Sequence, residues 1–272
     1  MPPRIILPIA VLALAGCSPE AEVQDRTRVE ATAKTGTGGG ASASATASSA
    51  EGSSVKEEND LYVFEYSWPA QAAALPGLVA WLEQDRDRAR DELVAEAKED
   101  RAGREQNDFP YHPHSFGEEW KAVADLPGWL SLSGEFHTFS GGAHGMYGVE
   151  GLVWDKAGGR GFKSEELFQS PGYLGSTMGD RVCAALNKER EKRRGEPVDP
   201  NDEFFGDCPE LDEATILVGS SNGRTFDRIT VYFGPYVAGP YAEGAYELDF
   251  PMTQEMLEAV KPAYRAAFSA KG

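Results

Sequence analysis

The chain has 272 residues and carries 26 Lys and Arg against 44 Asp and Glu, which gives a formal net charge of −18. This charge argues against nucleic-acid binding, because a phosphate backbone repels so acidic a protein. The acidic balance favours solubility and suits a basic partner, although most acidic surfaces are simply solvated.

The N-terminus has the features of a secretory signal. Arg4 precedes an apolar run from Ile5 to Leu14, roughly ten residues, which is too short to span a bilayer as a helix. The run leads into Ala15-Gly16-Cys17, and this end resembles the lipobox of bacterial lipoproteins, in which the cysteine receives acyl chains such as palmitate. We therefore expect a signal peptide at residues 1–16 and lipid on Cys17. The alternative is an ordinary signal peptide with a chance cysteine.

The segment after the cysteine predicts both a location and a tether. Ser18 stands where an aspartate would commonly retain a lipoprotein in the inner membrane, so we expect an outer-membrane lipoprotein of a Gram-negative bacterium, facing the periplasm or the cell surface. Residues 17–56 are expected to form a disordered tether, because Ala31 to Ser54 is almost wholly Ala, Gly, Ser and Thr. The membrane is then a partner only through the N-terminal acyl chains.

The N-terminal part of the folded domain, residues 57–150, is predicted to begin with a strand, because large aromatic residues alternate from Tyr62 to Trp68. A long amphipathic helix follows, with Pro76 at its first position. After a loop at 109–111, the region from Trp120 to Trp154 has the alternation of strands, interrupted by Gly141 and Gly142.

The C-terminal part, residues 151–272, is predicted to contain a second amphipathic helix at 174–194 and a hairpin whose turn is Asn222-Gly223. A strand at 246–250 and a final helix, which starts after Thr253 and is buried through Phe268, complete the chain. The expected fold class is α+β: mainly antiparallel sheets packed with two long helices and a C-terminal helix.

Cys183 and Cys208 are the two cysteines that lipid does not account for. An oxidising compartment favours a disulfide between them, which would close a loop of about 26 residues and contribute roughly 3.5 kcal/mol in the chain-entropy model. The alternatives are a metal-binding pair or two buried thiols.

Two motifs resemble one bacterial extracytoplasmic family. The first runs from Phe136 through the Gly-Gly-Ala-His stretch to Gly145, and the second from Phe233 through Tyr236 to Pro251. Both resemble the paired domains of unknown function in RsiV-type anti-sigma factors, which sense lysozyme, and in PdaC-type peptidoglycan deacetylases. The resemblance spans residues 60–268. It implies a recognition surface for a lysozyme-like protein or a wall-associated ligand. We find no sigma-binding segment and no deacetylase domain in the sequence, so we do not expect those activities.

The best-marked candidate site is the loop formed by Ser140, Gly141, Gly142, His144 and Gly145. Paired glycines allow a sharp turn and expose N–H groups to a ligand. Ser140 and His144 also raise the hypothesis of a nucleophile with its base, but the serine lacks the context of a nucleophile elbow. A structural turn held by His144 is the first interpretation, contact with a ligand the second, and catalysis the third.

Three further patterns carry weaker hypotheses. His112 and His114, with Asp108, Glu118 and Glu119, are metal-ligand residue types, but their spacing favours a surface loop, and we expect no metal and no cofactor. Tyr236 and Tyr241 follow Gly-Pro pairs and are candidate partner contacts, whereas Tyr246 is expected in the core. An acidic run flanks the second cysteine and is expected to be a solvated loop: Asp207, Glu210, Asp212 and Glu213.

These observations leave three hypotheses. The first is a non-catalytic binding module for a lysozyme-like protein, and the second is an accessory protein that binds peptidoglycan or another glycan. The third is a hydrolase that uses His144. We expect no catalytic residues and therefore prefer the first two.

Overall fold

The computed structural model describes residues 51–199, 201–202 and 204–271. The predicted signal peptide at 1–16, the lipidated Cys17 and the larger part of the predicted tether lie outside the described residues. The described residues belong to one compact unit. None of the helices in these ranges is both long enough and apolar enough to cross a membrane.

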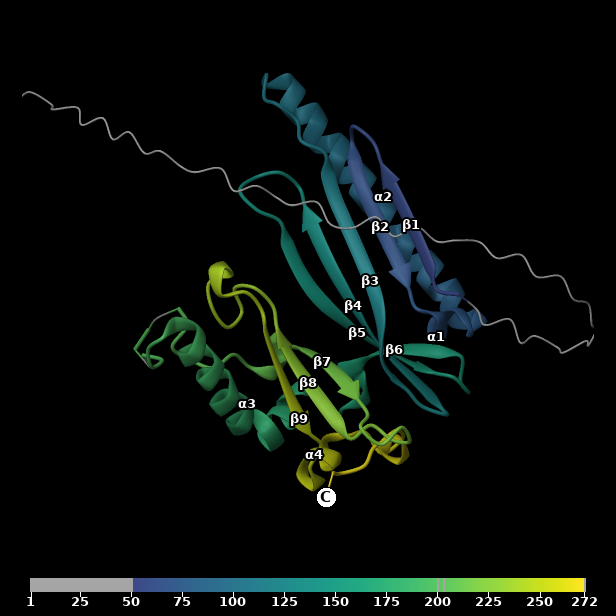
Figure 1. The fold of residues 1–272 in the computed structure, drawn as a ribbon, viewed down its shortest axis with the longest axis vertical. Coiled ribbons are helices and arrows are strands. Elements are labelled where there is room, and N and C mark those ends of the chain that lie inside the picture. The colour runs from purple at the N-terminus through teal and green to yellow at the C-terminus, as the bar shows by residue number, and fades with distance from the viewer. Residues whose placement is uncertain (1–50, 200, 203, 272) are drawn as a thin grey trace, which may run out of the picture. The chain divides into compact units, whose positions relative to one another are not determined.

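The larger sheet has six strands in chain order, and Figure 1 shows them side by side. All neighbouring strands are antiparallel except β2 and β3, which are parallel because the long helix α2 connects them as a crossover. The predicted antiparallel character therefore holds for every other pair. The strands are β1 (Ser53–Glu58), β2 (Tyr62–Trp68), β3 (His114–Asp125), β4 (Trp129–Phe139), β5 (Met146–Asp155) and β6 (Arg160–Lys163).

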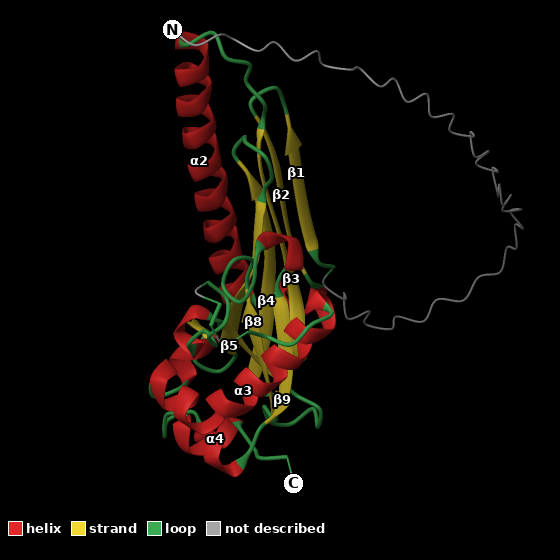
Figure 2. Cartoon of the chain, turned by 90° about the vertical axis from the view of Figure 1, so that its left-hand side faces the viewer, coloured by secondary structure: helices red, strands yellow, loops and turns green. Residues whose placement is uncertain are grey.

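One face of this sheet is covered by α2 (Pro76–Gln106), preceded by the short α1 (Ala70–Ala73). Figure 2 shows α2 lying along the strands. Pro76 occupies the first turn, where a missing backbone N–H costs nothing. The helix buries one apolar stripe against aromatic residues of β2 and β3, and that stripe consists of Leu78, Leu82, Ala89, Leu93 and Ala97.

The smaller sheet is antiparallel and consists of β7 (Thr215–Gly219), β8 (Arg228–Phe233) and β9 (Tyr246–Pro251). It shares a core with α3 (Pro171–Arg194), α4 (Gln254–Ala259) and Val153 of β5. Four 3₁₀ turns complete the described elements: Ser164–Leu167, Leu211–Glu213, Tyr241–Glu243 and Arg265–Ala267. The combination of two sheets with long helices confirms the α+β class.

Two predicted boundaries need correction. The tether was expected to extend to residue 56, but β1 begins at Ser53 and pairs along its length with β2. Its alternating polar residues suit an edge strand, which is why they looked like linker. The C-terminal helix ends at Ala259 and does not reach Phe268, because Pro262 lacks the N–H that a continuing helix needs. The boundary at 150/151 between the two predicted parts falls inside β5.

Candidate functional site

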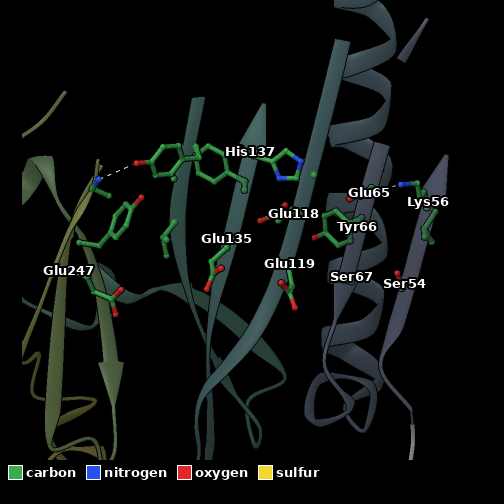
Figure 3. A pocket seen from close by; sticks show the side chains of 18 residues that line it. Ser54, Lys56, Glu65, Tyr66, Ser67, Glu118, Glu119, Glu135, His137 and Glu247 are labelled. Carbon is green, nitrogen blue, oxygen red and sulfur yellow. Dashed lines mark hydrogen bonds and ion pairs between the residues drawn. The ribbon is translucent and has the colours of Figure 1, made fainter. Parts of the chain in front are cut away.

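The face of the large sheet opposite α2 is covered only over part of its length. Near Ser131 and Val153 this face is buried, and Val153 belongs to the core that the small sheet shares. Towards the other end of the strands it opens into a groove of about 670 Å³, bordered on one side by Tyr232, Ala245 and Glu247 of the small sheet's end. Figure 3 shows this groove between the two sheets.

The floor of the groove consists of side chains that share two cross-strand rows. Strand pairing aligns one row as Lys56, Glu65, Gly117, His137 and Tyr147. The next row is Ser54, Ser67, Glu119, Glu135 and Val149. Because side chains alternate between the faces of a strand, alternate residues of β1 to β5 at this end of the sheet face the groove.

Negative charge exceeds positive charge in this groove. Glu65, Glu119, Glu135 and Glu247 contribute four carboxylates to its lining, whereas Lys56 contributes one ammonium group. Lys121 lies beside the groove and pairs with two of these carboxylates. Lys56 lies 2.5 Å from Glu65, and its hydrogen bond lowers the pKa of that carboxyl.

The ammonium group of Lys121 is shared between two carboxylates of the groove. The Nζ of Lys121 lies 2.6 Å from Glu135 and 3.2 Å from Glu119, and the hydrogen bond to Glu135 raises the lysine's pKa. Glu247 is exposed and makes no ion pair with any described residue. The groove is therefore an anionic surface at neutral pH.

Gly117 shapes the middle of the groove. A Cβ at this position would collide with the imidazole of His137, so the glycine lets the ring lie across the strand. His137 is itself exposed and borders the groove from β4, as Figure 3 shows. The absence of a side chain at Gly117 therefore accommodates the His137 ring against the strand.

One end of the groove carries an aromatic cluster that unites residues about a hundred positions apart. The rings of His144 and Tyr241 stack with centroids 3.9 Å apart, and the Tyr236 hydroxyl lies 3.2 Å from His144 Nε2. Tyr241 also donates a hydrogen bond of 2.9 Å to the Gly145 carbonyl. Tyr147 joins the cluster to the groove floor, because its ring contacts Tyr241 edge-on. We call His144, Tyr147, Tyr236 and Tyr241 the aromatic cluster.

The backbone around the cluster is held in uncommon conformations. Gly141 and Gly142 have φ of 89° and 100°, which accounts for glycine at both positions of this turn. Tyr236 has φ of 69°, which is uncommon for a bulky residue, and its side chain is 50% exposed. Such a conformation persists only where the surroundings fix it, and it presents the ring outward.

The residues of the predicted loop at 140–145 lie on two different sides of the large sheet. His144 and Gly145 contact the tyrosines, whereas Ser140 borders a second cavity on the α2 side. Gly141 lies beside the Arg104 guanidinium of α2. Both ring nitrogens of His144 have partners other than a serine: Nδ1 lies 2.9 Å from the Gly145 carbonyl and Nε2 faces Tyr236.

The prediction for the His112–His114 segment was wrong at one residue. His112 is exposed in a loop, as expected, but His114 begins β3 and is only 3% exposed. Its Nε2 lies 3.1 Å from Asp100 of α2, and that carboxylate also accepts a hydrogen bond from Arg104. His114 therefore ties the strand to the helix. No group of three or more potential metal ligands occurs among the described residues.

Glu118 is a buried carboxylate that the sequence analysis did not single out as buried. Glu118 and Glu119 are neighbours on opposite faces of β3, and Glu118 faces α2 with 7% of its surface exposed. Burial, with the nearby charges of Asp85 and Glu150, raises its pKa to about 8. Alternation with Phe116 and Trp120, both large and apolar, was the signal that Glu118 points inward.

The disulfide and the acidic run lie apart from the groove. Cys183 and Cys208 form a disulfide, with their Cα atoms 5.6 Å apart. Arg190, on the same helix as Cys183, is fully buried and donates hydrogen bonds to the carbonyls of Asp207 and Ala238. Asp212 and Glu213 lie in the 3₁₀ turn at Leu211–Glu213, and Glu210 before it donates a backbone hydrogen bond of 3.1 Å to the Glu213 carboxylate. All four acidic residues are exposed, as predicted for a solvated loop.

Comparison with known proteins finds one family model that matches part of the chain. The model of the family described as "Deacetylase PdaC" matches residues 55–147, from β1 to the start of β5. The match confirms the resemblance predicted from the first motif; the second motif lies beyond the matched range. No curated protein matches the chain.

Two solved structures resemble the chain at low identity. A member of the DUF3298 family from Bacteroides fragilis is 16% identical to this chain, with a TM-score of 0.44. The match covers 80% of this chain and 96% of the Bacteroides protein. A DUF3298 family protein from Pseudomonas aeruginosa PAO1 is 17% identical to this chain, with a TM-score of 0.46. The match covers 81% of this chain and 97% of the Pseudomonas protein. Neither likeness bears on the function of this chain.

Proposed function

Because residues 55–147 match the extracytoplasmic PdaC family, we propose that this chain is a non-catalytic binding module outside the cytoplasm, whose acidic groove receives a basic protein of the lysozyme class. The observation that carries the proposal is the excess of carboxylates over ammonium groups in the groove. A positive partner surface would neutralise that excess and would be steered to it over several ångströms.

The shape of the groove supports a protein partner. Its floor is a rigid sheet of five strands, and its volume of about 670 Å³ is open on one side. A groove fixed by strand pairing suffers little reorganisation on binding, which lowers the entropic cost of association. The unpaired carboxylate of Glu247 is free to meet a lysine or arginine of the partner.

The arrangement of the motif residues supports a role without catalysis. A Ser-His hydrolase needs the serine oxygen within hydrogen-bond reach of the imidazole. Here the two ring nitrogens of His144 face Gly145 and Tyr236, and Ser140 borders the cavity on the opposite face of the sheet. We therefore assign His144 to the support of the aromatic cluster.

The experiment is titration calorimetry of the full-length protein with a c-type lysozyme at low and at physiological salt. We expect binding that weakens with salt, and we expect Glu119→Gln, Glu135→Gln and Glu247→Gln together to weaken it about tenfold or more. The matched control removes the same charge from exposed positions that do not line the groove: Glu99→Gln, Glu191→Gln and Glu255→Gln. Equal weakening by both triple variants would refute the assignment to the groove.

The aromatic cluster favours a second candidate, a peptidoglycan or glycan ligand. Tyr236 exposes half of its surface at the groove's end, beside the stacked rings of His144 and Tyr241. Flat rings with polar tips stack on sugar faces and also donate hydrogen bonds. Sedimentation with isolated peptidoglycan tests this candidate. Retention that Tyr236→Ala abolishes and the control Tyr173→Ala preserves would support it, whereas a protein that stays in the supernatant would exclude it.

The anchor remains part of the proposal. We propose that acyl chains on Cys17 hold the protein at the outer membrane. The lipobox-like Ala15-Gly16-Cys17 and Ser18 after it support this proposal, and several acyl chains on one cysteine would anchor a protein firmly. Labelling of cells with a palmitate analogue, followed by fractionation, tests it. Loss of the label and release of the protein on Cys17→Ser are expected, and a Cys17→Ser protein that stays bound to membranes would contradict the anchor.

A further inference from the structure

A second cavity lies on the opposite face of the sheet from the groove. It measures about 340 Å³, lies between α2 and strands β3 to β5, and is open to solvent on one side. Beside Leu93, α2 lines the cavity with a small and a polar residue: Ala89 belongs to its buried stripe, and Asp85 precedes it by one turn. These side chains do not reach Phe116 and Phe136 on the sheet as a leucine would.

Glu118 is the unusual group in this cavity. Its side chain is 7% exposed, and no described residue donates a hydrogen bond to its carboxylate or forms an ion pair with it. Gly134, on the neighbouring strand, makes room for it, because a Cβ there would lie 2.5 Å from Glu118 Oε1. A largely buried carboxylate without a hydrogen-bond donor is costly, and a bound group that supplies such donors is one way to offset that cost.

The surroundings of Glu118 are negative. Asp85 accepts a hydrogen bond from Tyr66 and pairs with Arg88, which also reaches Glu92 at 3.4 Å. The charged and titratable groups that border the cavity are Asp85, Arg88, Glu92 and Glu96 of α2, His114 of β3 and Glu150 of β5. Arg88 is therefore the single arginine or lysine among the lining residues, and it is engaged by α2's own carboxylates.

We propose that this cavity binds an alkylammonium group, whose positive charge pairs with Glu118 and whose hydrocarbon chain lies against Phe116 and Phe136. An ammonium group would supply the hydrogen-bond donors that Glu118 lacks, and the phenyl walls suit methylene groups. A bare metal ion fits less well, because no described set of three ligands converges. The inference is independent of the groove and of the function proposed for it.

The ligand is either a free diamine or a lysine side chain of another protein, and two probes distinguish them. Cadaverine represents the first source, and an N-acetylated lysine amide represents the second, while pentane-1,5-diol is the uncharged control. Each is titrated calorimetrically into the full-length protein across about pH 6 to 8.5, where both amines stay protonated. The buried carboxyl must ionise for binding, so affinity should rise up to about tenfold per pH unit below pH 8.

Glu118→Gln should abolish binding of either amine, and the control Glu99→Gln, on the exposed side of α2, should leave it unchanged. The amine that binds with the lower dissociation constant identifies whether the ligand is a free diamine or a lysine side chain. Binding of the diol as strongly as the amines, binding that survives Glu118→Gln, or no binding of either amine at about pH 8.5 would overturn the proposal. Far-ultraviolet circular dichroism of the variant establishes that it is folded.

Discussion

Replacement of Glu118 by glutamine should stabilise the protein, and the gain should depend on pH. Burial raises the pKa of Glu118 from 4.5 to about 8. Between those values the folded chain keeps a proton that the unfolded chain has released, so rising pH lowers the free energy of unfolding by about 1.4 kcal/mol per pH unit. Above pH 8 the free energy of unfolding of the wild type is therefore about 3 to 5 kcal/mol lower than it is below pH 4.5. Glutamine has no such titration and resembles the protonated carboxyl in shape.

The assay is urea denaturation of both proteins at about pH 5.5 and about pH 9, with the disulfide intact. Near pH 5.5 the Glu118→Gln protein should be more stable than the wild type by only about 1.4 kcal/mol, and near pH 9 by about 3 to 5 kcal/mol. Glu99→Gln, an exposed change of the same kind, should show no such divergence. A stability difference between wild type and Glu118→Gln that is the same at both pH values would refute the reasoning.

Three other substitutions test the fold. Cys183→Ser with Cys208→Ser should lower the free energy of unfolding by about 3.5 kcal/mol, measured by urea denaturation; a loss below about 1 kcal/mol would contradict the loop-entropy argument. Gly134→Ala should cost about 2 kcal/mol, because the methyl group meets a buried carboxylate and an indole, whereas Gly128→Ala, in open space, should cost little by thermal unfolding. Tyr241→Phe should cost about 1 kcal/mol through the lost hydrogen bond to the β4–β5 loop, and unchanged hydrogen exchange of that loop would argue against the bond.

Much of the fold followed from periodicity. The aromatic alternation at 62–68, the helical spacing after Pro76 and the Asn222-Gly223 turn each predicted the element that the structure contains. What periodicity could not reveal was the polar edge strand β1, whose residues have no apolar face, and the parallel pairing of β2 with β3. Both depend on tertiary partners that the local sequence does not specify.

The candidate site was only partly accessible to sequence reasoning. His144, Tyr236 and Tyr241 were singled out separately, and the structure brings their rings together. The acidic groove was not predicted, because its carboxylates come from four strands of two sheets and look like ordinary exposed charges in sequence. Glu118 and Glu119 illustrate the difficulty: two adjacent identical residues face a buried cavity and an open groove, and only the strand register tells them apart.

Carboxyl footprinting tests the central claim, that the groove is where a basic protein binds, most directly. The full-length protein is labelled with a carbodiimide and an amine, with and without saturating c-type lysozyme, and the labelled glutamates are identified by mass spectrometry. We predict that lysozyme protects Glu119, Glu135 and Glu247, while Glu99 and Glu191, outside the groove, are labelled equally in both samples. Equal labelling of the three groove carboxylates with and without lysozyme would contradict the account.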